Sequence, residues 1–497
     1  MRTRASSPYL RWGSLIFALL AAILTVFQLV QYSLLRADYP ADMTVGGVPV
    51  GGLDPQAAAQ RLLEVYATAV EIQYQGAVIH LDPALVGFQP DVESMLAEAD
   101  LQRTGAPFWP GFWDYLWNRR AAARQTPLVA SYSEDRLRAY LRDEISARYD
   151  QPPTPAQPVP GTSSFTPGAP GQVLDVDRAV VLIEAALRSP DQRVVALSSQ
   201  RTAAARPSVQ TLEILLRQII DQSGFDGLTD LYFLDLQTSE RIHFAYQEGQ
   251  DIPVTPDDIS FTASSTIKIP IMVSVFRHFN SQIDADTDTL LKNMIERSDN
   301  IASDSLMFLI DEVRGPLVVT QSMRDLGLEN SFLAGYFFPG ATLLQNFYTP
   351  ANTRVDVNTS PDDYNQTTPS DMGMLLEDIY LCAENGGGSL IAAFGGQIDQ
   401  AACQKMIEYL KADDLGALIQ GGVPEGTMVA HKHGWVSDIN TGVLNHISDA
   451  GIIYTPGGNY VLTIYVFHPE QALWDLVAPM DAELSRAVYN YFNLPSQ

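Results

Sequence analysis

The longest apolar run of the chain lies near its N-terminus. Residues 14–35 read SLIFALLAAILTVFQLVQYSLL, which only glutamines and a few hydroxyl groups interrupt. A helix of about 20 apolar residues can span the hydrocarbon core of a bilayer, so the run predicts one membrane-spanning helix. Arg2, Arg4 and Arg11 precede it, and such an excess of positive charge keeps that end in the cytoplasm.

A cleaved signal peptide is the alternative interpretation of this run. Signal peptides usually have a shorter apolar stretch that ends in a small-x-small cleavage site. Here the stretch is long and continues into Gln-Tyr-Ser-Leu-Leu-Arg. We favour an uncleaved single-pass anchor over residues 1–36, with an N-terminus inside and the rest of the chain outside the cytoplasm.

Short helical and strand-like patterns alternate from residue 37 to residue 205. Asp54-Pro55 is a good helix start, because aspartate caps free N–H groups and proline lacks one. Residues 70–81 alternate as a strand does. Helical patterns are found near 91–101 and over 133–148, a Pro-rich segment covers 151–171, and strand-like residues 172–177 lead into a helix that runs through Leu187. We predict a small α+β module.

An aromatic segment stands within this module, where residues 108–120 read FWPGFWDYLWNRR. Aromatic rings with a polar edge favour the headgroup region of a bilayer, so a membrane contact is one reading. Trp113 and Trp117 lie one helical turn apart, which also suits ordinary packing. We expect packing in the core or at a domain interface.

A second, larger domain is expected over residues 206–497, after a linker near residues 201–208. A helix is predicted over 210–222, followed by strands at 231–236 and 242–246. A further pair of strands is predicted at 450–454 and 460–467. These roughly 290 residues suffice for one large domain.

Charge and cysteine content narrow the possible functions. The net charge is −27, and no cluster of Lys and Arg appears, which argues against nucleic-acid binding. The two cysteines, Cys382 and Cys403, could form a disulfide outside the cytoplasm, worth about 3 kcal/mol in the chain-entropy model. Two free buried thiols remain the alternative. No Cys-x-x-Cys or His-rich spacing points to a metal.

The first motif with catalytic chemistry is Ser265-Thr-Ile-Lys268. On a helix this spacing places the hydroxyl and the amine on one face. Serine is a weak nucleophile until a base takes its proton, and a desolvated lysine can be that base. A helix that starts at the serine also directs N–H groups toward a developing oxyanion.

Two further motifs follow in the chain. Ser298-Asp-Asn300 comes about thirty residues later and, on its own, would be read as a helix cap or turn. Lys432-His433-Gly434-Trp435 precedes the last predicted strands. A lysine followed two residues later by glycine lets substrate backbone lie along an edge strand near a positive charge.

Together, in this order, the three motifs resemble the signature of class A β-lactamases and penicillin-binding proteins. The flanks agree: residues 366–372 read QTTPSDM, like the Thr-Thr-Pro segment of that family, and Val-Ala-His precedes Lys432. The resemblance covers residues 208–497. It implies an α+β fold of the β-lactamase/transpeptidase type, a five-stranded antiparallel sheet covered by helices with a helical subdomain.

The resemblance also implies roles for the matching residues. Ser265 would be the acylated nucleophile, Lys268 its proton acceptor, and Ser298 the relay that returns a proton to the departing amine. Asn300 would hold the substrate amide, and Lys432 would attract the substrate carboxylate.

The rest of the lysine motif would line the substrate site. His433, Gly434 and Trp435 are expected to contact substrate, and the N–H groups of Ser265 and Trp435 would form the oxyanion hole. His433 departs from the family, which usually has Thr or Ser there. A metal site from His431 and His433 would lack a third ligand, so we expect neither metal nor cofactor.

A second departure concerns deacylation. The resemblance implies a Glu-x-x-Leu-Asn segment shortly before Thr-Thr-Pro, whose glutamate activates water. Residues 348–364 contain no glutamate, and Asp356, Asp362 and Asp363 are the remaining carboxylates there. Since general-base help is worth roughly 10²–10⁴-fold, deacylation should be slow.

Three functions remain after the sequence is read. The leading one is a serine hydrolase that acts on β-lactams or on related D-alanyl peptides of the bacterial wall. A penicillin-binding D,D-peptidase and a catalytically weak wall-binding scaffold are the rivals. Residues 45–55, VGGVPVGGLDP, resemble the opening of peptidoglycan-binding modules in membrane-anchored wall proteins, although a simple stalk is equally compatible.

Overall fold

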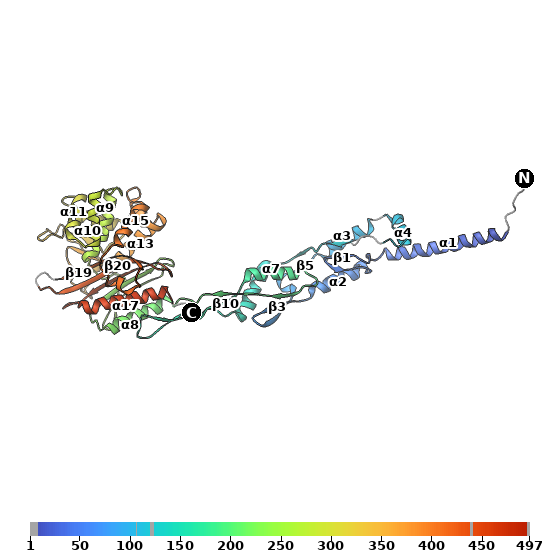
Figure 1. Cartoon of the computed structure of the whole chain (residues 1–497), viewed down its shortest axis with the longest axis horizontal. Helices are drawn as coiled ribbons and strands as arrows, with labels where there is room; N and C mark the ends of the chain where they lie inside the picture. The colour runs from blue at the N-terminus through green and yellow to red at the C-terminus, as the bar shows by residue number, and fades with distance from the viewer. Residues whose placement is uncertain (1–7, 106, 120–123, 438–440, 495–497) are drawn as a thin grey trace. The chain divides into compact units, whose positions relative to one another are not determined.

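The computed structural model describes residues 8–105, 107–119, 124–437 and 441–494. The chain divides into two compact units, Met1–Pro153 with Pro170–Ala203, and Thr154–Ala169 with Ala204–Gln497 (Figure 1). Each unit has its own hydrophobic core. Arg2 and Arg4 lie outside the described residues.

The first unit begins with the long helix α1 and continues with short helices and strands. Its helical elements are α1 (Pro8–Leu35), α2 (Pro55–Ala67), η1 (Pro83–Val86), α3 (Val92–Thr104), α4 (Phe108–Leu116), α5 (Glu134–Tyr140), η2 (Leu141–Ser146), α6 (Ala147–Tyr149) and α7 (Val176–Leu187). Its strands are β1 (Thr44–Val45), β2 (Val48–Pro49), β3 (Val70–Tyr74), β4 (Ala77–Leu81), β5 (Gln89–Pro90), β6 (Gln125–Thr126), β7 (Ala130–Ser131), β10 (Gly171–Leu174), β11 (Val194–Ala196) and β12 (Ser199–Thr202).

Local signals explain where these elements start. The Asp54 carboxylate accepts a hydrogen bond from the N–H of Ala57 at 2.8 Å and caps α2 as its sequence predicts. The alternation over residues 70–81 is a hairpin rather than one strand, because Gln75 and Gly76 both have positive φ (49° and 79°) and turn the chain back. Within α1, Trp12–Leu35 is long and apolar enough to span a bilayer.

The second unit carries the large sheet. Its helical elements are α8 (Val209–Ser223), η3 (Ser264–Ile267), α9 (Lys268–His278), α10 (Ala285–Glu296), α11 (Asn300–Ile310), α12 (Gly315–Asp325), η4 (Ala351–Thr353), α13 (Pro369–Asn385), α14 (Ser389–Phe394), α15 (Gln400–Leu410), α16 (Ile419–Gly422) and α17 (Trp474–Phe492). Its strands are β8 (Gln157–Pro158), β9 (Phe165–Thr166), β13 (Leu228–Asp235), β14 (Arg241–Gln247), β15 (Gln250–Ile252), β16 (Phe261–Thr262), β17 (Phe332–Leu333), β18 (Asn365–Thr367), β19 (Met428–Ser437), β20 (Leu444–Tyr454) and β21 (Tyr460–Phe467).

The main sheet has six antiparallel strands in the order β15-β14-β13-β21-β20-β19, one more than we expected. The additional strand is β15, whose three residues pair with β14 across the turn at Glu248 and Gly249. β19, which carries the lysine motif, lies at the opposite edge of the sheet. The expectation that this motif stands on an edge strand is therefore confirmed.

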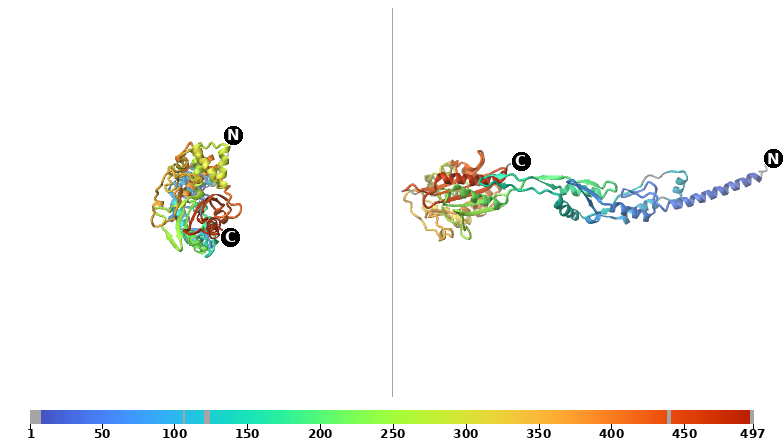
Figure 2. Two further views of the ribbon diagram at one scale, coloured as in Figure 1. Left: turned by 90° about the vertical axis from the view of Figure 1, so that its left-hand side faces the viewer. Right: turned by 90° about the horizontal axis from the view of Figure 1, so that it is seen from below.

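Helices cover both faces of the sheet. Leu231 and Phe233 of β13 point into a core shared with α8 and α17, whereas Tyr232 and Leu234 point into the core formed by the other helices. This alternation is the expected one for a strand that is buried on both sides. Figures 1 and 2 show α8 and α17 together on one face, and α9, α10, α11 and α13 beyond the other.

The Pro-rich segment belongs to the second unit, although we expected it in the first. Residues 154–169 form the β8–β9 hairpin, whose Ala156 and Phe165 are buried in the α8–α17 core. The Ala156 N–H also donates to the Ala205 carbonyl at 3.1 Å. The burial of Ala156 and Phe165 shows that residues 154–169 belong to the second unit, which their position in the sequence does not reveal.

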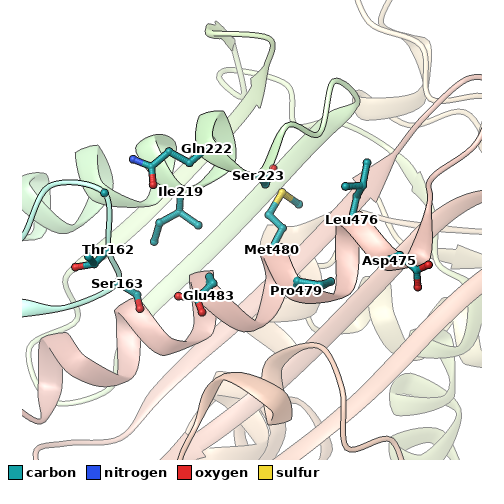
Figure 3. A pocket seen from close by; sticks show the side chains of 11 residues that line it. Thr162, Ser163, Ile219, Gln222, Ser223, Asp475, Leu476, Pro479, Met480 and Glu483 are labelled. Atoms are coloured by element: carbon teal, nitrogen blue, oxygen red, sulfur yellow. The ribbon is translucent and has the colours of Figure 1, made fainter.

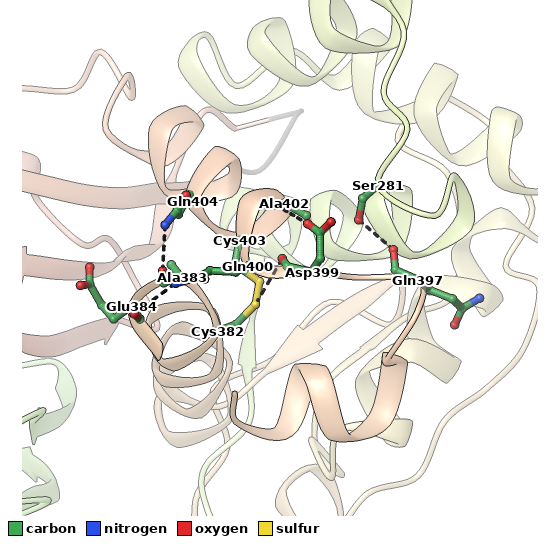
Figure 4. The surroundings of a disulfide bond; sticks show 10 residues. All are labelled: Ser281, Cys382, Ala383, Glu384, Gln397, Asp399, Gln400, Ala402, Cys403 and Gln404. Carbon is green, nitrogen blue, oxygen red and sulfur yellow. Dashed lines mark hydrogen bonds between the residues drawn. A yellow bond between two sulfur atoms is a disulfide. The ribbon is translucent and has the colours of Figure 1, made fainter. Parts of the chain in front are cut away.

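Cys382 and Cys403 form a disulfide, as we had favoured over two free thiols. The bond joins α13 to α15 (Figure 4). Gln400 and Gln404 of α15 both donate to the Ala383 carbonyl of α13. The bridge therefore adds a covalent link to two helices that already pack together.

Candidate active site

The predicted nucleophile and base stand where a short 3-10 turn leads into α9. Ser265 lies in η3 and Lys268 opens α9, one turn later. Pro270 falls in the first turn of α9, where a missing N–H costs no helical hydrogen bond. The Lys268 Nζ lies 2.8 Å from the Ser265 Oγ. The spacing thus places the two groups in contact, as predicted.

The Ser-Asp-Asn motif lies directly over this pair. Lys268 Nζ is 2.8 Å from the Ser298 carbonyl oxygen, 3.0 Å from the Ser298 Oγ and 2.8 Å from the Asn300 Oδ1. The Ser298 hydroxyl also contacts the Ser265 Oγ at 2.8 Å. Asp299 caps α11 by accepting from the N–H groups of Ile301 and Ala302, which fixes the motif at the start of that helix.

The backbone beside both serines is strained. Ser264, which precedes the predicted nucleophile, has φ of 53°, and Ser298 has φ of 55°. A residue other than glycine rarely adopts this left-handed conformation, and it costs about 1–3 kcal/mol. Strain of this kind is typical of functional sites, where the surroundings hold a side chain in one direction.

Burial and charge set the protonation of Lys268. Its side chain is fully buried, and desolvation together with the nearby Lys432 charge lowers the pKa of its amine to about 7, against the opposing carboxylates of Asp299, Asp413 and Asp304. A neutral amine that donates to the Ser298 carbonyl and to Asn300 keeps a lone pair for the Ser265 proton. Lys268 can therefore act as a base near neutral pH.

The lysine of β19 lies in a buried ion-pair group. Lys432 Nζ contacts Asp413 Oδ2 at 3.0 Å, and the His433 Nδ1 lies 2.7 Å from Asp413 Oδ1. Burial alone would raise the pKa of Asp413, but the His433 hydrogen bond and the Lys432 charge outweigh it and lower the pKa to about 2. Asp413 was missed in the sequence, because it follows α15 in no recognisable motif.

Strand β19 passes close to the serine. A Cβ added to Gly434 would lie 2.9 Å from the Ser265 nitrogen, so glycine is needed for this approach. Trp435 is 45% exposed and stacks on the His433 ring at 4.9 Å. His433 itself is buried with its Nδ1 on Asp413, and its predicted contact with substrate stays a prediction.

The carboxylates expected near a deacylation site are engaged elsewhere. Asp356 pairs with Arg354 at 2.6 Å, and Asp362 accepts from the N–H of Tyr364. Within the part of the chain that the structure describes, the Lys268 amine contacts Ser265, Ser298 and Asn300, and neither aspartate. The Lys268 amine instead lies 5.5 Å from the centre of the Phe337 ring, a residue that sequence reasoning also missed.

A loop contact holds Phe337 there. Its N–H donates to the Asp304 carboxylate at 2.7 Å, and Asp304 stands on α11 one turn after Asn300. The helix that carries the Ser-Asp-Asn motif thus also fixes an aromatic ring beside the base. An apolar ring provides no group that could activate water.

A separate cluster of titratable groups could in principle hold a metal. Ligand atoms of Asp230, His243 and Asp258 lie within 4.8 Å of one another. Burial alone would lower the pKa of His243, but the two carboxylates raise it to about 10. A protonated imidazole is a cation, so the three groups form a buried ion-pair group. His431 and His433 contact different carboxylates, Asp449 and Asp413.

A hollow of about 260 Å³ lies away from the motifs, between α8, α17 and the β8–β9 hairpin (Figure 3). Ile219, Met480 and Pro479 give it an apolar wall, and Glu483 and Asp475 stand at its rim. None of the motif residues lines it. We therefore assign no part of the chemistry to this hollow.

Part of the second unit matches a known protein family. Residues 283–492 match the family model described as the Beta-lactamase enzyme family. Ser298, Asn300 and Lys432 lie within the match, whereas Ser265 and Lys268 precede it. No curated protein matches the chain. The second unit has the β-lactamase/transpeptidase fold, and at the level of the family it is similar to class A β-lactamases and penicillin-binding serine hydrolases.

Several solved structures resemble part of the chain. PBP-A is 20% identical, with 58% of this chain and 99% of PBP-A covered and a TM-score of 0.41. A β-lactamase from Sphaerobacter thermophilus is 18% identical, with 58% and 99% covered and a TM-score of 0.41. A class A β-lactamase from Bacteroides cellulosilyticus is 18% identical, with 57% and 98% covered and a TM-score of 0.42.

Proposed function

We propose that the second unit is a serine acyl-transfer hydrolase that β-lactams acylate at Ser265, and that it turns the acyl-enzyme over slowly. The observation that carries this proposal is the buried Lys268 amine, 2.8 Å from the Ser265 Oγ, with a pKa of about 7. A base of this pKa next to a serine is what nucleophilic catalysis at neutral pH requires.

The proposed acylation uses the observed contacts in sequence. Lys268 takes the Ser265 proton, and Ser265 Oγ attacks the lactam carbonyl carbon. The carbon–nitrogen bond then breaks, and the Ser298 hydroxyl, which contacts both Lys268 Nζ and Ser265 Oγ, gives a proton to the departing nitrogen and takes one from the protonated Lys268. The N–H groups of Ser265 and Trp435 would hold the oxyanion, while Asn300 and Lys432 orient the substrate.

Slow deacylation follows from the surroundings of Lys268. The ring of Phe337 stands beside the amine, and the nearby Asp304 carboxylate is occupied by the Phe337 N–H. A water there would have no glutamate to activate it, and such general-base help is worth roughly 10²–10⁴-fold. A mutant of PBP-A has been described as an acyl-enzyme complex with penicillin G, which supports β-lactams as a substrate class.

Labelled penicillin tests the acylation directly. Mass spectrometry should show a lasting adduct on Ser265, absent from Ser265→Ala and retained in the neighbouring Ser264→Ala. A folded protein without an adduct would refute the proposal, and rapid hydrolysis of a chromogenic cephalosporin would refute slow turnover. A D,D-peptidase acting on D-alanyl wall peptides is the alternative, and a change of muropeptide composition in Ser265→Ala cells would favour it.

The remaining proposals concern the rest of the chain. Residues 1–36 would anchor the protein in the cytoplasmic membrane with the N-terminus inside, supported by the apolar length of α1. Residues 37–205 would bind peptidoglycan or act as a spacer. Binding of purified wall sacculi by wild-type protein, compared with a chain that lacks residues 45–55, would decide between these two roles.

A further inference from the structure

The aromatic helix α4 is attached to the last turns of α1. The Tyr32 ring of α1 contacts Phe108, Phe112 and Tyr115 of α4, with ring centroids 5.3, 5.6 and 5.4 Å apart. The Tyr115 hydroxyl also contacts Gln28 Oε1 at 3.1 Å. These contacts place α4 beside the C-terminal end of α1.

Glycine allows the two helices to approach this closely. A Cβ added at Gly111 of α4 would lie 2.2 Å from the Tyr32 hydroxyl oxygen. The side of α4 that holds Phe108, Phe112 and Tyr115 is therefore the one occupied by α1.

The opposite side of α4 presents tryptophans to the outside. Trp109, Trp113 and Trp117 follow one another at intervals of four residues and are 61%, 58% and 70% exposed. We expected the segment to pack in the core or at a domain interface; Phe112 is buried, but the exposure of Trp113 and Trp117 is against core packing for these two rings. Three large exposed rings on one face mark a surface that faces something other than water.

The position of Tyr32 along α1 indicates what this surface faces. Trp12 and Tyr32 are 20 residues apart, which is about 30 Å on a helix and equals the thickness of the hydrocarbon core. Tyrosine and tryptophan favour the two levels where headgroups meet the acyl chains. If Trp12 lies at one headgroup interface of the bilayer, Tyr32 and the aromatic rings of α4 lie at the other.

Basic groups gather at the same place. The Arg36 guanidinium lies 5.5 Å above the Phe108 ring, and Arg103 Nη1 donates to the Arg36 and Ala37 carbonyls. Arg103 also pairs with Asp100 at 3.0 Å, and the exposed Arg119 pairs with Asp114 at 3.7 Å. Arginine side chains can donate to the phosphate groups of lipids, but the paired aspartates offset much of the positive charge here, so the aromatic face carries the argument.

We propose that residues 108–117 form an interfacial collar, which lies in the outer headgroup region of the bilayer and inserts Trp109, Trp113 and Trp117 beside α1. This inference rests on the proposed membrane anchor. The collar would hold the start of the extracytoplasmic part at a fixed depth. A second copy of the chain, or a soluble partner, would be the alternative occupant of this face.

Lipid quenching of tryptophan fluorescence tests the collar in the full-length protein. The variant Trp12→Phe/Trp435→Phe/Trp474→Phe keeps only the three collar tryptophans and is reconstituted into vesicles of phosphatidylcholine and phosphatidylglycerol. We expect blue-shifted emission, quenched at least twofold by lipids brominated near the headgroup and less by lipids brominated near the chain ends. Emission typical of water, with no quenching by either lipid, would overturn the collar.

A second comparison avoids changes elsewhere in the protein. The difference in emission between wild type and Trp109→Phe/Trp113→Phe/Trp117→Phe should show the same quenching pattern. Flotation of the vesicles separates the two hypotheses: protein that floats without lipid quenching refutes the collar alone, whereas protein that does not float refutes the anchor. Blue-shifted emission that persists in detergent, without lipid quenching, would indicate a protein partner and also overturn the collar.

Discussion

At the scale of single residues, the Lys268 amine should control the pH dependence of acylation. Burial and the Lys432 charge lower its pKa to about 7, so the amine is charged and unable to accept a proton well below that pH. The acylation rate should therefore rise with pH, with a midpoint near 7, and level off above it. Single-turnover acylation by a chromogenic cephalosporin between pH 5 and pH 9 measures this.

Lys268→Gln provides the control for this prediction. It keeps a side chain of similar length that cannot accept the proton, and we expect acylation to fall by about 10²–10⁴-fold. The midpoint near pH 7 should disappear with it. An unchanged profile in this variant would show that another group titrates.

Phe337 should control the lifetime of the acyl-enzyme. Phe337→Glu would place a carboxylate beside the Lys268 amine, where the aromatic ring now lies. We expect adduct decay to become about 10–100-fold faster, since a general base can then activate water. Mass spectrometry of the adduct over time measures the decay. Phe337→Leu is the matched apolar control and should keep the long lifetime; equal lifetimes in both variants would contradict the idea.

At the scale of elements, Asp413 joins the loop after α15 to the edge strand β19. Its carboxylate is fully buried between Lys432 and His433. Asp413→Asn removes the charge and leaves buried Lys432 unpaired, so the free energy of unfolding of this unit should fall by about 3–5 kcal/mol. Urea denaturation measures the change. Asp414→Asn, at the exposed neighbour, is the control and should change it by less than about 1 kcal/mol.

The disulfide between α13 and α15 should also stabilise the second unit. Its cysteines are 21 residues apart, and closing a loop of this length is worth about 3 kcal/mol in the chain-entropy model. Cys382→Ser/Cys403→Ser should lower the free energy of unfolding by roughly this amount. Wild-type protein under reducing conditions should approach the same free energy of unfolding. An unchanged unfolding midpoint in the double variant would show that helix packing alone holds α13 and α15 together and that the disulfide adds no stability.

The sequence predicted those parts of the structure that leave a local pattern. The motifs at Ser265 and Ser298 predicted residues that the structure brings into contact. Alternating or helical runs located α1, α8, β13, β14 and β21, whereas α10, α12, α15 and α17 were not predicted. Asp413 and Phe337 lie outside any motif, and only folding brings them to Lys432 and Lys268. Their roles therefore required coordinates.

Three features of the fold differ from the predictions, and each difference has a physical cause. The Gln75-Gly76 turn was a readable hairpin signal that we took as continuous strand. The strand β15 has only three residues, two of them polar, so its pattern is too short to detect. The segment 154–169 joined the second unit through the burial of Ala156 and Phe165, a tertiary contact that composition does not encode.

At the scale of the whole molecule, the proposed membrane anchor predicts which parts of the chain are accessible from outside the cell. Protease added to intact spheroplasts should remove the second unit and leave an N-terminal tag protected, because the arginines before α1 favour the cytoplasmic side. Immunoblotting for a tag at each end of the chain measures the loss of the second unit and the protection of the N-terminus. The same protease after lysis should remove both tags. A protected C-terminal tag in intact cells would reverse the topology, and it would place Ser265 on the side of the membrane where wall peptides are absent.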